Sequence, residues 1–258
     1  MKKLMHGSNE IISIKNSSNG FLYKRPMVIR MTHSTNEINL GNYTSEYPMF
    51  KVNNNIIIDW GDNSPTSTMI NYNGFTTEGK IYHKFIDNKL THDITFIGDI
   101  TNIMSTCFYG GSLTSASLPY GLTTIAMDAF AHCVNLSSVS IPYGVTTLEG
   151  HAFNGCSSLS SIEIPNSVTT LEGYAFNGCN SLSSIEIPNS VTSIGFGCFG
   201  NCNNLNTYQL YWTGNNIITY DSVNMPNNTN TKFYVPKGQK TNYVNKGYPS
   251  AKVIERTS

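Results

Sequence analysis

A 23-residue unit that recurs in register over residues 113–205 limits the fold of this chain more than any other feature. Each copy opens on a leucine and carries a phenylalanine near its end. One copy is too short to bury its own apolar face, so the copies must stack into a solenoid with a continuous core, and its ends need caps. The positions are Leu113, Leu136, Leu159, Leu182 and Leu205, with Phe130, Phe153, Phe176 and Phe199.

The copy at 159–181 shows how one coil is built. Apolar residues first alternate as in a short strand, which Pro165 ends because proline has no backbone N–H to donate. A second apolar pair follows the turn at 166–167, and three further residues close the coil. The residues expected to point inward are Leu159, Ile162, Ile164, Val168, Leu171, Ala175, Phe176 and Cys179.

The unit LSSIEIPNSVTTLEGYAFNGCNS (159–181) resembles the BspA-like leucine-rich repeats, also called the Treponema pallidum type, whose pattern is approximately LxxIxIPxxVTxIxxxAFxxCxx. This resemblance implies a leucine-rich repeat solenoid over residues 99–210. A degenerate copy is expected before residue 113, because Ile100, Ile103, Cys107 and Phe108 keep the spacing seen later at Val145, Leu148, Ala152 and Phe153.

The segment 231–255 resembles the terminus on which such arrays often end. The resemblance implies a C-terminal cap over residues 211–258. We expect Phe233 and Val235 on a last strand, with Tyr243 and Tyr248 covering the open end of the solenoid.

The first hundred residues lack the repeat, and β-type runs at 27–31, 56–60 and 94–97 are broken by Asn, Gly and Pro clusters. The strings IIIDWGDNS (56–64) and YHKF (82–85) resemble the WGDGS and H-x-[YF] signatures of PKD-like immunoglobulin-fold domains. Asn63 stands where that family usually has glycine, but Asn also tolerates positive φ. The resemblance implies a β-sandwich over residues 1–98, a structural role for His83, and a strand at 93–97 that leads directly into the first coil. The whole chain is therefore expected to be mainly β.

The charge balance argues against some partners. Only 12% of residues are charged, 16 basic against 16 acidic, so no strong field would attract nucleic acid or an anionic membrane. A surface of neutral polar groups suits recognition of sugars or polar protein faces, and it equally suits a merely soluble shell.

Four cysteines, Cys133, Cys156, Cys179 and Cys202, share the repeat spacing and form one column. Adjacent coils lie about 4.8 Å apart, and side chains in one column point the same way, which is poor geometry for a disulfide. We expect packed, free thiols, with disulfides and a metal site as alternatives.

Catalytic signatures are missing from the sequence: there is no HExxH, no GxSxG and no glycine-rich phosphate loop. We therefore expect no enzyme activity, no cofactor and no metal. Asp59 and Asp62 flank Trp60 in a turn where carboxylates commonly accept backbone donors. A calcium site completed by Asp87 or a carbonyl oxygen is the alternative.

Strand alternation predicts which side chains face outward from the first strand of each coil. One outward column is Ser115, Ser138, Ser161, Ser184 and Thr207, and a second is Ser117, Ser140, Glu163, Glu186 and Gln209. Two stacked acids would repel each other, and a cation or basic partner could relieve them; the alternative is that they are simply solvated. A second candidate patch lies on the turns, at Tyr120, Tyr143, His151 and Tyr174.

The segment MKKLMHGSNEIISIK lacks the apolar run of a signal peptide, and no stretch reaches the length of a transmembrane span. The repeat resemblance implies a surface adhesin. Together these favour a non-enzymatic recognition or adhesion module, displayed on a phage virion or a cell surface, that binds a protein or glycan on a host or matrix. The expected partners also include other virion proteins, and we expect no insertion into a membrane. The alternative is a cytoplasmic protein–protein interaction scaffold.

Overall fold

The structure of the protein is a computed structural model, and it is mainly β with little helix. The residues that it describes are 13–15, 21–23, 27–32, 37–43, 50–52, 56–59, 61–62, 67–69, 71–72, 75–76, 79–84, 89, 91–97, 100–226 and 229–257.

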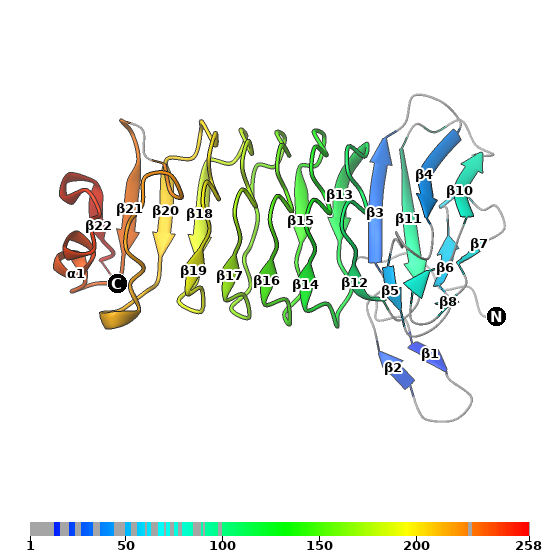
Figure 1. The fold of residues 1–258 in the computed structure, drawn as a ribbon, viewed down its shortest axis with the longest axis horizontal. Helices are drawn as coiled ribbons and strands as arrows, with labels where there is room; N and C mark the ends of the chain where they lie inside the picture. The colour runs from blue at the N-terminus through cyan, green and yellow to red at the C-terminus, as the bar shows by residue number, and fades with distance from the viewer. Residues whose placement is uncertain are drawn as a thin grey trace.

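The repeats stack as coils along the long axis of the molecule (Figure 1). Each coil can contribute one strand to each of two rows. Strands of neighbouring coils pair in parallel at the repeat spacing, as Ser115 with Ser138 in the first row and Thr147 with Thr170 in the second. The first row contains β13 (Leu113–Ser117), β15 (Ser138–Ser140), β18 (Ser184–Ile187) and β20 (Thr207–Leu210). The second contains β12 (Ile100–Ile103), β14 (Thr124–Ile125), β16 (Thr147–Leu148), β17 (Thr170–Leu171) and β19 (Ser193–Ile194).

The early copy predicted before residue 113 is present. Ile103 pairs in parallel with Ile125 of the next coil, and the Phe108 ring stacks on Phe130 with 5.2 Å between ring centroids. The second row of strands was not predicted as strands, although the sequence marks it with the apolar pair that follows each turn.

The strands before residue 98 are antiparallel, and they include those predicted at 27–31 and 93–97 (Figure 1). They are β1 (Ser13–Lys15), β2 (Phe21–Tyr23), β3 (Met27–Thr32), β4 (Glu37–Tyr43), β5 (Phe50–Val52), β6 (Ile56–Asp59), β7 (Ser67–Met69), β8 (Asn71–Tyr72), β9 (Phe75–Thr76), β10 (Gly79–Lys84) and β11 (Thr91–Ile97). Strand β3 pairs with β13, and β5 pairs with β12. Both rows of the solenoid therefore continue as sheets into the N-terminal strands.

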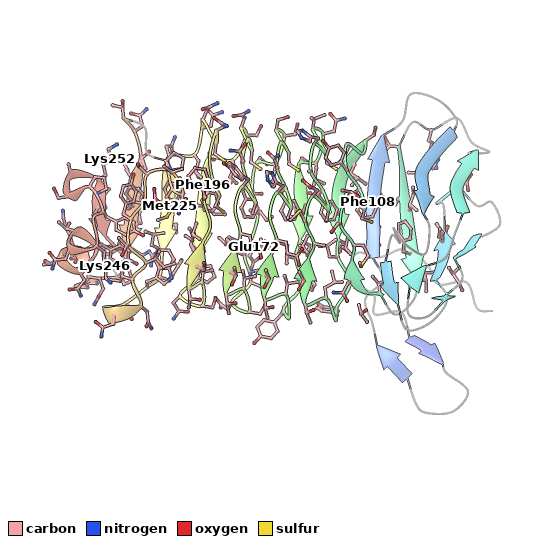
Figure 2. All side chains as sticks on the ribbon, viewed as in Figure 1. Phe108, Glu172, Phe196, Met225, Lys246 and Lys252 are labelled. Atoms are coloured by element: carbon pink, nitrogen blue, oxygen red, sulfur yellow. The ribbon has the colours of Figure 1, made fainter. Side chains whose placement is uncertain are left out.

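The core consists of the predicted columns, and its phenylalanines form one stack. Consecutive rings from Phe130 to Phe199 lie 5.3, 5.5 and 5.4 Å apart and within 8° of parallel. Phe108 opens the stack at the N-terminal end of the solenoid (Figure 2). Tyr208 meets Phe199 edge-on and ends the series of parallel rings. Offset aromatic stacking adds to the free energy of burial, so this column ties each coil to the next.

One predicted strand is wrong. Leu159, Ile162 and Ile164 are buried as expected, but residues 161–165 adopt no regular secondary structure. The first row is therefore split into a six-stranded sheet that ends at β15 and a four-stranded sheet that begins at β18. The coil is attached more loosely here, because Ser160 N lies 3.4 Å from Ser137 O. Glu163 and Glu186 occupy the same position in neighbouring coils, and opposed like charges disfavour strand pairing.

The C-terminal end is closed by β21 (Lys232–Val235), α1 (Lys240–Asn245), β22 (Val253–Glu255) and the 3₁₀ turns Gly214–Asn216 and Ser250–Lys252. Tyr243 and Tyr248 are buried over this end, as predicted. The strand carrying Phe233 and Val235 is not the last one, because β22 pairs with it in parallel.

Trp212 anchors the closing segment, and its role was not predicted. Its ring is fully buried, and its Nε1 donates to Val191 O at 2.7 Å. The Tyr243 hydroxyl in turn donates to Trp212 O at 3.0 Å.

Within the described part of the chain, none of the helices has the length and apolar character needed to traverse a membrane.

Candidate binding groove on the repeat face

An open groove of about 960 Å³ lies on the outer face of the first row of strands. It crosses the coil at 159–181, which has no strand in the first row, and reaches β15 on one side and β18 on the other. Six of the ten residues predicted for the two outward columns line it, all of them exposed: Ser138, Ser140, Ser161, Glu163, Ser184 and Glu186.

The floor of the groove is apolar where the coils separate. Inward-pointing side chains of the second row, such as Leu148 and Leu171, are completely buried. In contrast, the inward residues under the groove retain between 6% and 9% exposure: Val139, Ile141, Ile162 and Ile164. The groove therefore offers hydroxyls and carboxylates on its walls and a narrow apolar strip beneath them.

The charge of the groove is negative. Glu163 and Glu186 are its only ionisable carboxylates, and none of the residues that line it is Lys, Arg or His. The Tyr211 hydroxyl donates to Glu186 Oε2 at 3.3 Å and so gives that carboxylate one partner. Arg256 lies beyond Tyr211, with its guanidinium carbon 3.9 Å from the ring centroid. The C-terminal segment thus supports one end of the groove.

Thr207 and Gln209 belong to the predicted strip but not to the groove. Both are half-buried, and Gln209 Oε1 accepts a hydrogen bond from Arg256 Nε at 3.2 Å. The Thr207 hydroxyl donates to Asn206 Oδ1 at 3.2 Å. Sequence reasoning also missed Tyr211, although continuing the alternation from 207 and 209 by two residues would have found it.

The turn residues do not form one patch. Tyr120 and Tyr143 are 49% and 74% exposed, and each follows the first strand of its coil. His151 and Tyr174 follow the second strand, are half-buried, and stack with 4.9 Å between ring centroids. Both take a left-handed φ, 58° and 59°, which is unfavourable for bulky residues. Tyr174 was expected to be exposed; it is half-buried because its ring stacks on His151 and meets the Phe196 ring edge-on.

The cysteine column consists of free, buried thiols, as predicted, and all six cysteines are free. Each repeat thiol donates to the phenylalanine carbonyl of the preceding coil, as Cys133 Sγ does to Phe108 O at 2.9 Å and Cys202 Sγ to Phe176 O at 3.0 Å. Burial raises the pKa of the Cys133 and Cys202 thiols from 9.0 to about 12. The described residues contain no cluster of three or more His, Cys, Asp or Glu side chains that could hold a metal ion.

The predicted Asp59 turn is present. Asp59 Oδ1 accepts a hydrogen bond from Gly61 N at 2.9 Å, and Asp62 is buried. The other residues of this prediction, Trp60 and Asp87, lie outside the described residues, as does the side chain of His83.

Comparisons with known proteins bear on the repeat. Residues 101–223 match the family model described as BspA type leucine rich repeat region, in six copies. The chain is similar to the pneumococcal vaccine antigen PcpA, with a TM-score of 0.54 and 22% identity over 61% of this chain and 40% of that one. No curated protein gives a significant match.

Two further solved structures are similar. A leucine rich repeat protein of T. pallidum matches with a TM-score of 0.49 and 26% identity, over 61% of this chain and 80% of that one. A leucine-rich repeat protein of Bacteroides ovatus matches with a TM-score of 0.42 and 22% identity, over 56% and 38%. The match spans less than half of the pneumococcal and Bacteroides chains. The paired rows of strands, the phenylalanine and cysteine columns and the matched pattern together identify residues 101–223 as a leucine-rich repeat region of the BspA type.

Proposed function

We propose that this protein is a non-enzymatic binding module, and that its groove over the coils from β15 to β18 holds a polar protein segment or a glycan. The observation that carries the proposal is the coincidence of two independent features. Strand alternation marks a strip of outward hydroxyls and acids, and the structure has an open groove of about 960 Å³ along that strip.

The groove sets the chemistry of the ligand. Its four serines offer hydroxyls that both donate and accept, and Glu163 and Glu186 accept only. With no basic side chain on its walls, it favours a ligand that is neutral or cationic and rich in donors, such as sugar hydroxyls or lysine ammonium groups. Catalysis is not part of the proposal, since no histidine lines the groove to activate a serine as nucleophile.

The proposal includes the division of the chain into residues 1–98, 99–210 and 211–258. For the first unit we propose a PKD-like sandwich. It is supported by the antiparallel order β3-β11-β6-β7, by the separate β4–β10 pair, and by the Asp59 turn. An experimental structure of the whole chain tests it: two sheets packed face to face around Trp60 are expected, and a single sheet would contradict it.

The groove is tested with an array of neutral glycans and lysine-containing peptides probed with the whole chain. Ser161→Trp should fill the groove, and the pair Glu163→Gln and Glu186→Gln should remove its charge. We expect the first change to abolish binding of whichever array ligand is recognised. The second should weaken the binding of a cationic peptide by up to about tenfold, because each exposed charge pair is worth at most about 1 kcal/mol.

Tyr143→Ser is the matched control, since this side chain is exposed and does not line the groove. It should leave binding unchanged. Binding that survives Ser161→Trp but is lost with Tyr143→Ser would move the site to the turns, and no bound ligand on either array would contradict the groove.

Display on a virion or a cell surface is the part of the proposal that rests on the resemblance alone. It is tested by mass spectrometry of purified particles and by protease accessibility on intact cells; absence from both would overturn it. The alternative, a cytoplasmic scaffold, is favoured by the six free cysteines, because a reducing compartment keeps thiols reduced. Fractionation of the native host separates the two.

A further inference from the structure

A second candidate site lies at the last strand of the second row. This row grows by one two-residue strand per coil, in a constant register, and it ends at β19. The next coil is where the following strand would be expected, but within the described residues nothing pairs with the free side of β19. Such an open strand edge presents main-chain groups that can pair with another chain.

The hydrogen bonds show what is missing. The carbonyl oxygens of Thr123, Thr146 and Thr169 each accept from the backbone N of the next coil at 2.8 Å. The equivalent oxygen of Thr192 has no such partner in the described part of the chain. Ile194 O accepts from the side chain of Asn224, at 3.2 Å, in place of a backbone N–H.

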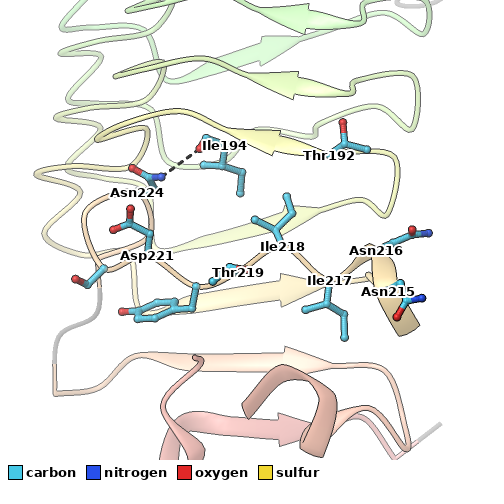
Figure 3. Close-up of a pocket in the computed structure, with 11 residues that line it drawn as sticks. Thr192, Ile194, Asn215, Asn216, Ile217, Ile218, Thr219, Asp221 and Asn224 are labelled. Atoms are coloured by element: carbon cyan, nitrogen blue, oxygen red, sulfur yellow. Dashed lines mark hydrogen bonds between the residues drawn. The ribbon is translucent and has the colours of Figure 1, made fainter. Parts of the chain in front are cut away.

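The segment that should supply the next strand runs alongside β19 but apart from it (Figure 3). The backbone groups of Ile218 and Thr219 make no hydrogen bond within the described residues. An open cavity of about 890 Å³ separates this segment from β19. The β19 wall therefore offers the unpaired carbonyl of Thr192, and the facing wall offers the backbone groups of Ile218 and Thr219. Between the walls lie the half-buried side chains of Ile194 and Ile218.

The charge of this cavity is also one-sided. Asp221 is exposed at one end, and the lining contains no Lys, Arg or His. An extended peptide matches all of these features. Its backbone pairs with an open edge, alternate apolar side chains contact the floor, and a basic residue can approach the carboxylate.

We propose that this cavity binds an extended segment of a partner polypeptide, which adds to β19 as a further strand. The segment pairs with Thr192 O, places an apolar side chain against Ile194 and Ile218, and places a lysine or arginine near Asp221. This site is distinct from the groove of the first row and does not depend on it.

The test uses the whole chain, with a displayed library of random nine-residue peptides as the probe. We expect enrichment of peptides in which apolar residues alternate and at least one residue is basic. The enriched peptide should bind the Ile194→Lys chain at least about tenfold more weakly and the Asp221→Asn chain severalfold more weakly. N-methylation of alternate amides of that peptide should abolish binding, because it removes the donors that pair with the edge.

A second disrupting variant and a control variant complete the test. Asn216→Arg alters the exposed rim and should also weaken binding. It serves as the test if circular dichroism shows that the Ile194→Lys chain is unfolded. The pair Glu163→Gln and Glu186→Gln lies in the other groove and should have no effect.

Failure to enrich any such peptide would overturn the proposal. Equal binding to the Ile194→Lys, Asn216→Arg and unchanged chains would do the same. A concentration-dependent dimer in sedimentation that Ile194→Lys abolishes would show that a second copy occupies the edge, and not a partner.

Discussion

The phenylalanine stack allows a quantitative test of how the coils are held together. Phe153 is fully buried, and its ring lies between those of Phe130 and Phe176 at 5.3 and 5.5 Å. Truncation of a buried phenylalanine to alanine costs about 3–5 kcal/mol, and each aromatic pair is worth about 0.5–1.5 kcal/mol beyond burial. Because two stacked pairs are lost, Phe153→Ala should cost about 4–5 kcal/mol.

Urea unfolding followed by circular dichroism measures this loss. With a slope of about 2–3 kcal/mol per molar urea, the midpoint should fall by about 1.3–2.5 M. Coincident fluorescence and dichroism curves check that unfolding remains two-state.

Phe196→Ala is the matched control, because Phe196 is 61% exposed and lies outside the stack. It should cost less than about 1 kcal/mol, as surface substitutions usually do. The reasoning is refuted if Phe153→Ala costs no more than Phe196→Ala, since the column would then contribute nothing to cohesion between coils.

Three further predictions concern buried polar groups. Folded Cys133 and Cys202 keep their protons to about pH 12, whereas the unfolded thiols lose them above about pH 9. The stability of the fold should therefore be complete at neutral pH and fall above pH 9 by about 1.4 kcal/mol per thiol per pH unit; constant urea midpoints from pH 8 to 11 would contradict this. Glu172 Oε2 accepts from Gly150 N at 2.9 Å, so Glu172→Ala should cost about 1–2 kcal/mol in urea unfolding and Glu172→Gln much less. Trp212→Phe should cost about 1–3 kcal/mol by thermal unfolding, because it strands the carbonyl of Val191, and an unchanged melting temperature would argue against that hydrogen bond.

The inward side of the fold could be predicted from residue types. The leucine, phenylalanine and cysteine columns are spaced by one unit, so any stacked arrangement must align them, and Phe153 and Cys156 are indeed buried in line with their neighbours. Sequence reasoning missed the structural role of Glu149 and Glu172, whose carboxylates accept hydrogen bonds from the preceding coil. Met127 N donates to Glu149 of the next coil at 2.9 Å, as Gly150 does to Glu172, and the only sequence signal is that these acids recur at the unit spacing.

The candidate site was predictable only in part. Alternation placed Ser161, Glu163 and Glu186 on the outer face, because side chains of an extended chain must alternate. It could not show that Gln209 is hydrogen-bonded to Arg256, which lies 47 residues away along the chain, because no local sequence pattern connects the two residues. For the same reason it could not show that Tyr211 joins the groove wall.

The coil follows from the residue pattern alone: its period, its inward and outward side chains, and its need for caps. The places where the rows of strands begin, break and end follow from the three-dimensional fold, at β3 and β5, at residues 161–165 and at β19. A repeat fixes which side chains face the core, because that choice depends only on short-range periodicity. Strand pairing depends on hydrogen bonds between distant segments, whose spacing can change while the pattern of residues stays the same.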